Sequence, residues 1–93
     1  MEPVTIIVTF DLKNAEPDDY DDVYELLEAE LGLSGIDLNG KALPSTTLLG
    51  QYPKGTTPKQ IADAVVGVAK RQLSVTVDCI LATQASPDAY LIS

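Results

Sequence analysis

The residue best placed for chemistry is Asp11, which follows an apolar run from Val4 to Phe10. The run is rich in β-branched side chains and predicts a strand that Asp11 ends. A carboxylate at the end of a strand can reach past the sheet edge and bind Mg²⁺, and a dimer would bring two such carboxylates together. The alternative interpretation is that Asp11 only ends the strand or caps a turn.

Several other chemistries are excluded by residues that the sequence lacks. It contains no histidine, which removes the Ser-His-Asp and Cys-His mechanisms and the commonest zinc ligand. Its one cysteine, Cys79, leaves no intramolecular disulfide. Cys79 lies in an apolar run, where we expect a small buried hydrophobe. The stretch from Gly50 to Gly55 does not have the phosphate-loop spacing and predicts a plain turn.

A second candidate site is an acidic segment, because eight of the fourteen Asp and Glu residues lie between Glu16 and Glu30. One interpretation is that these carboxylates stabilise the positive end of a helix and face water. Another is that they imitate the phosphates of a nucleic acid and bind a basic protein partner. The candidate partner-binding residues are Asp18, Asp19, Asp21, Asp22, Glu25 and Glu28.

The overall charge argues against direct binding to nucleic acid. The net charge is −8 and only six residues are basic. Affinity for nucleic acid comes largely from Lys and Arg side chains that displace counterions from phosphates. No apolar run approaches the roughly 20 residues that span a bilayer, and no signal peptide is visible. We therefore expect no membrane contact and a cytoplasmic protein.

Two helices are indicated by apolar residues at helical spacing. The first spans 17–31, with Pro17 at its first position and Gly32 as its stop. The second follows a capping box in which Thr57 is the N-cap and Gln60 the third helical residue. It ends near Leu73, after two basic residues that suit the negative end of the helix dipole.

Strands are predicted around these helices at 4–10, 45–52 and 75–82, with Gly50 as a bulge. Asn39-Gly40 predicts a hairpin within 36–43, and 89–92 predicts a short extra C-terminal strand. This order predicts one α+β domain over residues 1–93, a ferredoxin-like β-α-β-β-α-β sandwich. Its antiparallel sheet would carry both helices on one face. A second copy is the simplest cover for the other face, so we expect a homodimer.

The segment from Val4 to Asp11 resembles the start of the small CRISPR-associated adaptation proteins that partner the spacer integrase, and of the virulence-associated protein D family. In both, an apolar strand commonly ends in an aromatic residue followed by Asp, here Phe10-Asp11. The order of elements and the chain length also match. The resemblance implies a ferredoxin-like homodimer in which Asp11 of each subunit binds a divalent metal, as a nuclease or as a structural subunit only. The acidic charge and the scarcity of arginine depart from that pattern.

Three functional hypotheses follow. The first is a non-catalytic homodimeric interaction domain that needs no cofactor. The second is a Mg²⁺-dependent endonuclease in which Asp11 of each subunit is the catalytic metal ligand. The third is an acidic inhibitor, such as an antitoxin or an anti-defence protein, that occupies a basic nucleic-acid-binding protein.

Overall fold

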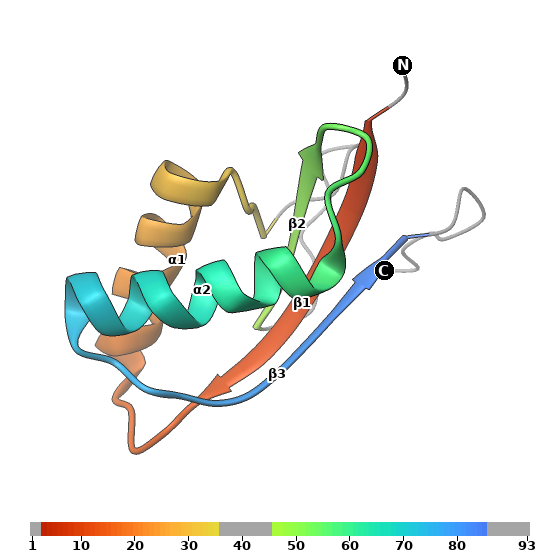
Figure 1. Ribbon diagram of the computed structural model, residues 1–93. Helices are drawn as coiled ribbons and strands as arrows, with labels where there is room; N and C mark the ends of the chain where they lie inside the picture. Colours follow the sequence, from red (N-terminus) through yellow and green to blue (C-terminus); the bar gives the residue numbers. More distant parts are fainter. Residues whose placement is uncertain (1–2, 36–45, 86–93) are drawn as a thin grey trace, which may run out of the picture.

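The structure is a computed structural model that describes residues 3–35 and 46–85. These residues form β1 (Val4–Leu12), α1 (Pro17–Leu31), β2 (Thr47–Tyr52), α2 (Pro58–Leu73) and β3 (Val77–Gln84). The strands form an antiparallel sheet in the order β2-β1-β3, and Figure 1 shows both helices on one side of it. The predicted α+β class is confirmed. The predicted hairpin at 36–43 and the terminal strand at 89–92 lie outside the described residues.

Alternation along β1 decides which side of the sheet becomes the core. Ile6, Val8, Phe10 and Leu12 are buried, whereas the residues between them are exposed or half-buried. Successive strand side chains point to opposite faces, so the even-numbered residues of β1 meet the helices. The residues with odd numbers point away from the helices.

The prediction that Asp11 ends the first strand is wrong, because β1 continues through Leu12. Asp11 pairs with Cys79 of β3, and the register shifts at the next step so that Leu12 pairs with Val77. Two residues of β3 therefore span one step of β1, which is the geometry of a β-bulge. The predicted bulge at Gly50 is also wrong, since the β1–β2 register runs without a shift through Ile6 and Gly50.

Helix α1 begins and ends as its sequence predicts. Pro17 occupies the first turn, and the Glu16 backbone N–H donates a 3.0 Å hydrogen bond to the Asp19 carboxylate. Gly32 ends the helix in the left-handed conformation, with φ of 66°. A glycine is favoured there because it has no Cβ to oppose this conformation.

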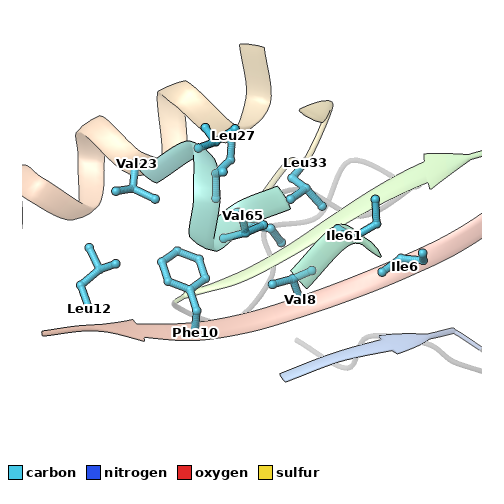
Figure 2. Packing of buried hydrophobic residues seen from close by; sticks show 11 residues of the cluster. Ile6, Val8, Phe10, Leu12, Val23, Leu27, Leu33, Ile61 and Val65 are labelled. Carbon is cyan, nitrogen blue, oxygen red and sulfur yellow. The ribbon is translucent and has the colours of Figure 1, made fainter. Parts of the chain in front are cut away.

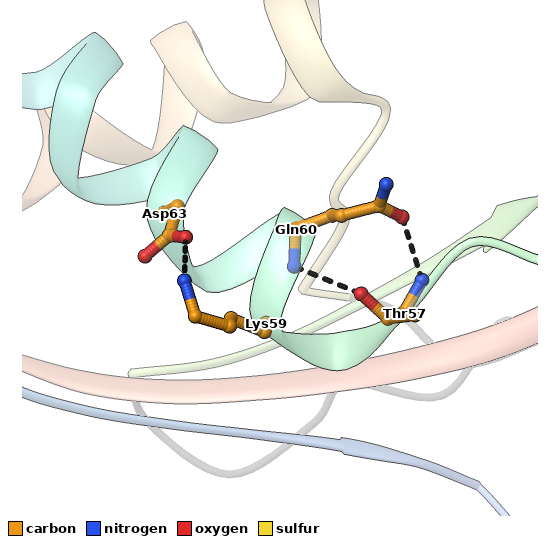
Figure 3. A network of polar contacts seen from close by, with 4 residues as sticks. All are labelled: Thr57, Lys59, Gln60 and Asp63. Atoms are coloured by element: carbon orange, nitrogen blue, oxygen red, sulfur yellow. Dashed lines mark hydrogen bonds and ion pairs between the residues drawn. The ribbon is translucent and has the colours of Figure 1, made fainter.

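The capping box predicted for α2 is confirmed (Figure 3). The Gln60 N–H donates to the Thr57 hydroxyl at 3.2 Å, and the Thr57 N–H donates to the Gln60 side-chain oxygen at 2.9 Å. Both bonds satisfy donors that the first turn of a helix leaves unpaired. Lys59, in the same first turn, forms an exposed ion pair at 2.6 Å with Asp63 of the next turn.

The core lies between the sheet and the two helices (Figure 2). Figure 2 shows Val23 and Leu27 of α1 and Val65 of α2 directed at the β1 side chains Val8 and Phe10. Since buried apolar surface contributes about 25 cal/mol per Å², this layer is the main source of stability. Its fully buried large side chains are Ile6, Val8, Val23, Leu27, Leu33 and Val65.

Candidate functional site

The sheet face that points away from the helices is the first candidate surface, and we call it the outer face. Pairing in register brings side chains from all three strands together on it. Its described members are Thr5, Ile7, Thr9 and Asp11 of β1, Thr47, Leu49 and Gln51 of β2, and Cys79, Leu81 and Thr83 of β3.

The apolar side chains of the outer face are partly open to water. Leu81 is 63% exposed, and it lies opposite Thr9 of β1. Ile7 and Leu49 pair with each other across β1 and β2 and are half-buried. An exposed leucine beside further apolar side chains marks a surface that can gain free energy by being covered.

Asp11 lies on the same face, at the end of the sheet where β1 and β3 shift register. Its carboxylate is exposed, and its partner Cys79 is exposed as well. The prediction that Cys79 is buried is therefore wrong. The apolar run around Cys79 gave the right kind of element, but strand alternation turns this residue to the outer face.

The surroundings of Asp11 decide what it can bind within one protomer. Among the described residues, no three His, Cys, Asp or Glu side chains gather to hold a metal ion. The cross-strand neighbour of Asp11 is the thiol of Cys79, whereas Mg²⁺ prefers oxygen ligands. Of Asp11 and Cys79, only the Asp11 carboxylate is a suitable Mg²⁺ ligand in a single protomer. The endonuclease hypothesis therefore requires a second copy of the chain to supply a second carboxylate.

The acidic residues of α1 form the second candidate surface. Asp18, Asp21, Asp22, Glu25 and Glu28 are all exposed, as the interpretation of a water-facing helix side requires. Asp19 differs, because it is half-buried and its carboxylate accepts the Glu16 N–H. Capping therefore accounts for Asp19, and the other five remain available on the surface.

Charge is distributed unevenly between the two helices. Helix α1 carries acidic residues and no basic residue, not even in its last turn, where a basic side chain would suit the helix dipole. Helix α2 carries Lys59, Lys70 and Arg71 against the single acid Asp63. Since α2 packs on β3 and β1, the β3 side of the molecule is the less acidic one.

Three tyrosine hydroxyls fix α1 to the sheet, one of them to β1 and two on the β2 side, a feature that sequence reasoning missed. The Tyr20 hydroxyl accepts the Leu12 N–H at 3.1 Å, and the Tyr24 hydroxyl accepts the Thr46 N–H at 3.2 Å. The Tyr52 hydroxyl donates to the Leu31 carbonyl at 2.7 Å, and burial raises the pKa of Tyr52. Tyr20 and Tyr24 are partly buried and pack against the core.

Phe10 completes this aromatic cluster. Its ring centroid lies 6.4 Å from that of Tyr20 and 6.0 Å from that of Tyr24, the latter edge-on. Because the polar ends of both tyrosines bond to backbone, the cluster holds α1 in place. The sequence did indicate these bonds, because a tyrosine on the core face of a helix needs a hydrogen-bond partner for its hydroxyl.

Comparison of the chain with protein-family models, curated proteins and solved structures finds no match. No helix within the described residues is long and apolar enough to cross a membrane.

Proposed function

We propose that this chain is a non-catalytic interaction domain with a ferredoxin-like fold that associates with a second copy of itself. The fold proposal is supported by the bridge between Ser34 and Leu49, which brings the chain after α1 to β2. In a ferredoxin-like sheet, the second strand of the β-α-β-β-α-β order runs beside the third. A cytoplasmic location belongs to the same proposal.

The single observation that carries the proposed self-association is the exposure of Leu81 at 63% on the outer face. The only other large apolar side chain exposed among the described residues is Val66 of α2, at 39%. A small domain has a thin core and gains stability from covering such a side chain. Pairing two copies would remove Leu81 of both from water.

The test is the mass of the protein in solution, measured by sedimentation velocity across a concentration series. We expect a concentration-dependent dimer in the wild type and a monomer for Leu81→Lys. Val66→Lys is the matched control, because it places the same charge on an exposed apolar residue of α2. A wild type that stays monomeric up to about millimolar concentration, where even weak complexes form, would refute self-association.

A second candidate function is binding of a basic protein partner by α1. It is favoured by the exposure of five acidic side chains on a helix that carries no basic residue. Replacing Asp21, Asp22 and Glu25 by their amides should weaken binding to a basic probe such as polylysine. The same replacements should leave the dimer intact, because α1 lies on the β2 side of the sheet.

A further inference from the structure

We infer that β3 is the edge through which two copies join, pairing antiparallel about a two-fold axis at Leu81 to form one continuous sheet. This inference rests on the proposed self-association and assigns the surface that performs it. The strand order places β3 at one end of the described sheet. Within the described part of the chain, no strand lies on the other side of β3.

The hydrogen-bond pattern shows which backbone groups of β3 face outward. The Ala85 N–H donates to the Thr5 carbonyl of β1 at 2.8 Å, so the odd-numbered residues of this segment bond toward β1. Backbone groups of successive strand residues point to opposite sides. The N–H and C=O groups of Ile80, Ala82 and Gln84 therefore point away from β1, and they form a template for another strand.

The side chains of β3 do little to protect this edge. Natural edge strands commonly carry Lys or Pro, which oppose pairing with another chain. Strand β3 contains neither, and Asp78 is its one charged residue. Its bulge lies at one end, opposite Asp11 and Leu12, and leaves the segment from Cys79 to Gln84 in regular register with β1.

A two-fold axis at Leu81 would pair the outward backbone hydrogen-bonding groups of β3 and would also cover its exposed apolar side chain. Ile80 of each copy would lie opposite Ala82 of the other and exchange both backbone hydrogen bonds. Leu81 would lie opposite its own copy as a close, non-hydrogen-bonded pair on the outer face, which covers the more exposed of the two large apolar side chains that the described residues leave open to water. Asp78 would lie opposite Gln84, so that no two carboxylates meet.

The charge distribution favours a second copy at this edge over one at any surface near α1. Both copies carry a net charge of −8, so they repel each other overall. Joining at β3 places the acidic α1 helices at the far sides of the dimer, because hydrogen bonds tie α1 to the β2 side. The helix nearest the junction is α2, in which basic residues outnumber acidic ones.

The dimer is expected to be weak. Eight strand residues at about 3.4 Å each give a strip about 27 Å long and about 10 Å high, so the two copies bury roughly 500 Å² in total. Stable interfaces bury about 1,200 Å² or more. A covalent trap is therefore the suitable assay.

The edge pairing also bears on the endonuclease hypothesis. Asp11 lies on β1, one strand in from the edge, so two Asp11 residues would be three strand spacings, or about 14 Å, apart across the sheet. They would also be offset by four residues, or about 14 Å, along the strands, which makes the separation roughly 20 Å. That distance is too long for both carboxylates to bind one Mg²⁺ ion directly, because each ligand oxygen lies about 2.1 Å from the metal. Edge pairing and a shared Asp11 metal site therefore exclude each other.

The test is disulfide trapping in the full chain. Leu81→Cys combined with Cys79→Ser should form a disulfide dimer under mild oxidation, because the two Cα atoms would lie about 4.5 Å apart. Thr83→Cys with Cys79→Ser is the matched control. It places a thiol on the same face, but the two copies of residue 83 would lie about 14 Å apart, so we expect at least about tenfold slower trapping.

Proline at Ala82 tests whether the backbone edge makes the contact. Ala82→Pro removes an N–H that points away from β1, and proline is tolerated where that group faces out from an edge strand. Added to the Leu81→Cys, Cys79→Ser variant, it should reduce trapping at least about tenfold, because it removes two hydrogen bonds across the axis. Circular dichroism of the proline variant should match that of its parent.

The outcomes separate the two proposals. Trapping that is equal at residues 81 and 83, or that survives Ala82→Pro in a folded protein, would overturn the edge assignment while leaving self-association in place. The absence of any dimer, trapped or sedimenting, would overturn both proposals. If Ala82→Pro unfolds the chain, the comparison of the two cysteine positions still decides the register.

Discussion

Replacing Gly50 with alanine should destabilise the protein, because the Tyr52 side chain occupies the space that a Cβ would need. A Cβ at Gly50 would lie 2.6 Å from the Tyr52 hydroxyl oxygen and 2.9 Å from two atoms of its ring. Gly50 does not have the positive φ that Gly32 and Gly55 have, so the obstacle is contact with Tyr52. The hydroxyl is held by the Leu31 carbonyl at 2.7 Å, and the ring cannot move without losing that bond.

The size of the effect follows from three terms. Loss of the hydrogen bond to Leu31 costs about 1 kcal/mol. Displacing the half-buried ring exposes roughly 40 Å² of apolar surface again, which costs about 1 kcal/mol. Alanine recovers about 0.5–1 kcal/mol by reducing the entropy of the unfolded chain. The free energy of unfolding should therefore fall by about 1–1.5 kcal/mol, and Tm by about 4–12 °C for a domain of this size.

The assay is a double-mutant cycle, with the free energy of unfolding measured by urea denaturation. Tyr52→Phe should cost about 1 kcal/mol in the wild type and close to nothing in the Gly50→Ala background, where the bond is already lost. Additive losses, or a Gly50→Ala variant as stable as the wild type, would refute the reasoning. Gly67→Ala is the control: α2 leaves space there, with Arg71 Nη1 as its nearest atom at 3.9 Å, so helix propensity should raise stability by about 0.5–1 kcal/mol.

Three further predictions concern the core, a helix cap and pH. Val65→Ala should cost about 2–3 kcal/mol in urea denaturation because Val65 is fully buried, whereas Val66→Ala on the exposed side of the same helix should change stability by less than about 0.5 kcal/mol. Thr57→Ala should cost about 1 kcal/mol by leaving the Gln60 N–H without its cap, and Thr57→Ser should recover most of that loss in thermal unfolding. Burial raises the pKa of Tyr52 in the folded state above the ordinary value of 10.0. The contribution of the protonated Tyr52 side chain to the free energy of unfolding is therefore fully present below pH 10.0 and is lost as the pH rises through the pKa of the folded state. Stability measured from pH 8 to 11 should consequently fall less steeply in Tyr52→Phe than in the wild type, and equal slopes would contradict this assignment.

The elements that the sequence predicted well are those whose ends depend on local chemistry. Helix α1 ends at Gly32 and α2 begins at Thr57 because a left-handed stop and a capping box each involve only neighbouring residues. The acidic residues 21, 22, 25 and 28 face water because helical spacing alone places them opposite the apolar positions. Such features need no knowledge of the rest of the chain.

The predictions that were wrong concern pairing between distant strands. Asp11 resembles a strand terminator because aspartate is rare in strands, yet pairing with Cys79 extends β1 by two residues beyond the predicted end. Cys79 resembles a core residue because its neighbours are apolar, but the register with β1 turns it outward. One indication of the contact between Tyr52 and Gly50 was present in the sequence, namely a glycine two residues from an aromatic residue on the same strand face. The structure is needed to show that the Tyr52 side chain fills the space beside Gly50.

Salt should distinguish the two candidate functions, because it acts on them with opposite signs. Two copies with a net charge of −8 repel each other, so added salt screens the repulsion and should strengthen self-association. Binding of a basic partner to α1 is an attraction between opposite charges, and the same salt should weaken it. The measurement is sedimentation and probe binding at about 0.05 and 0.5 M NaCl, between which the Debye length falls from roughly 14 to roughly 4 Å. A dimer that dissociates as salt rises would mean that oppositely charged groups hold it together, and it would contradict a junction formed by the nearly uncharged β3 edge.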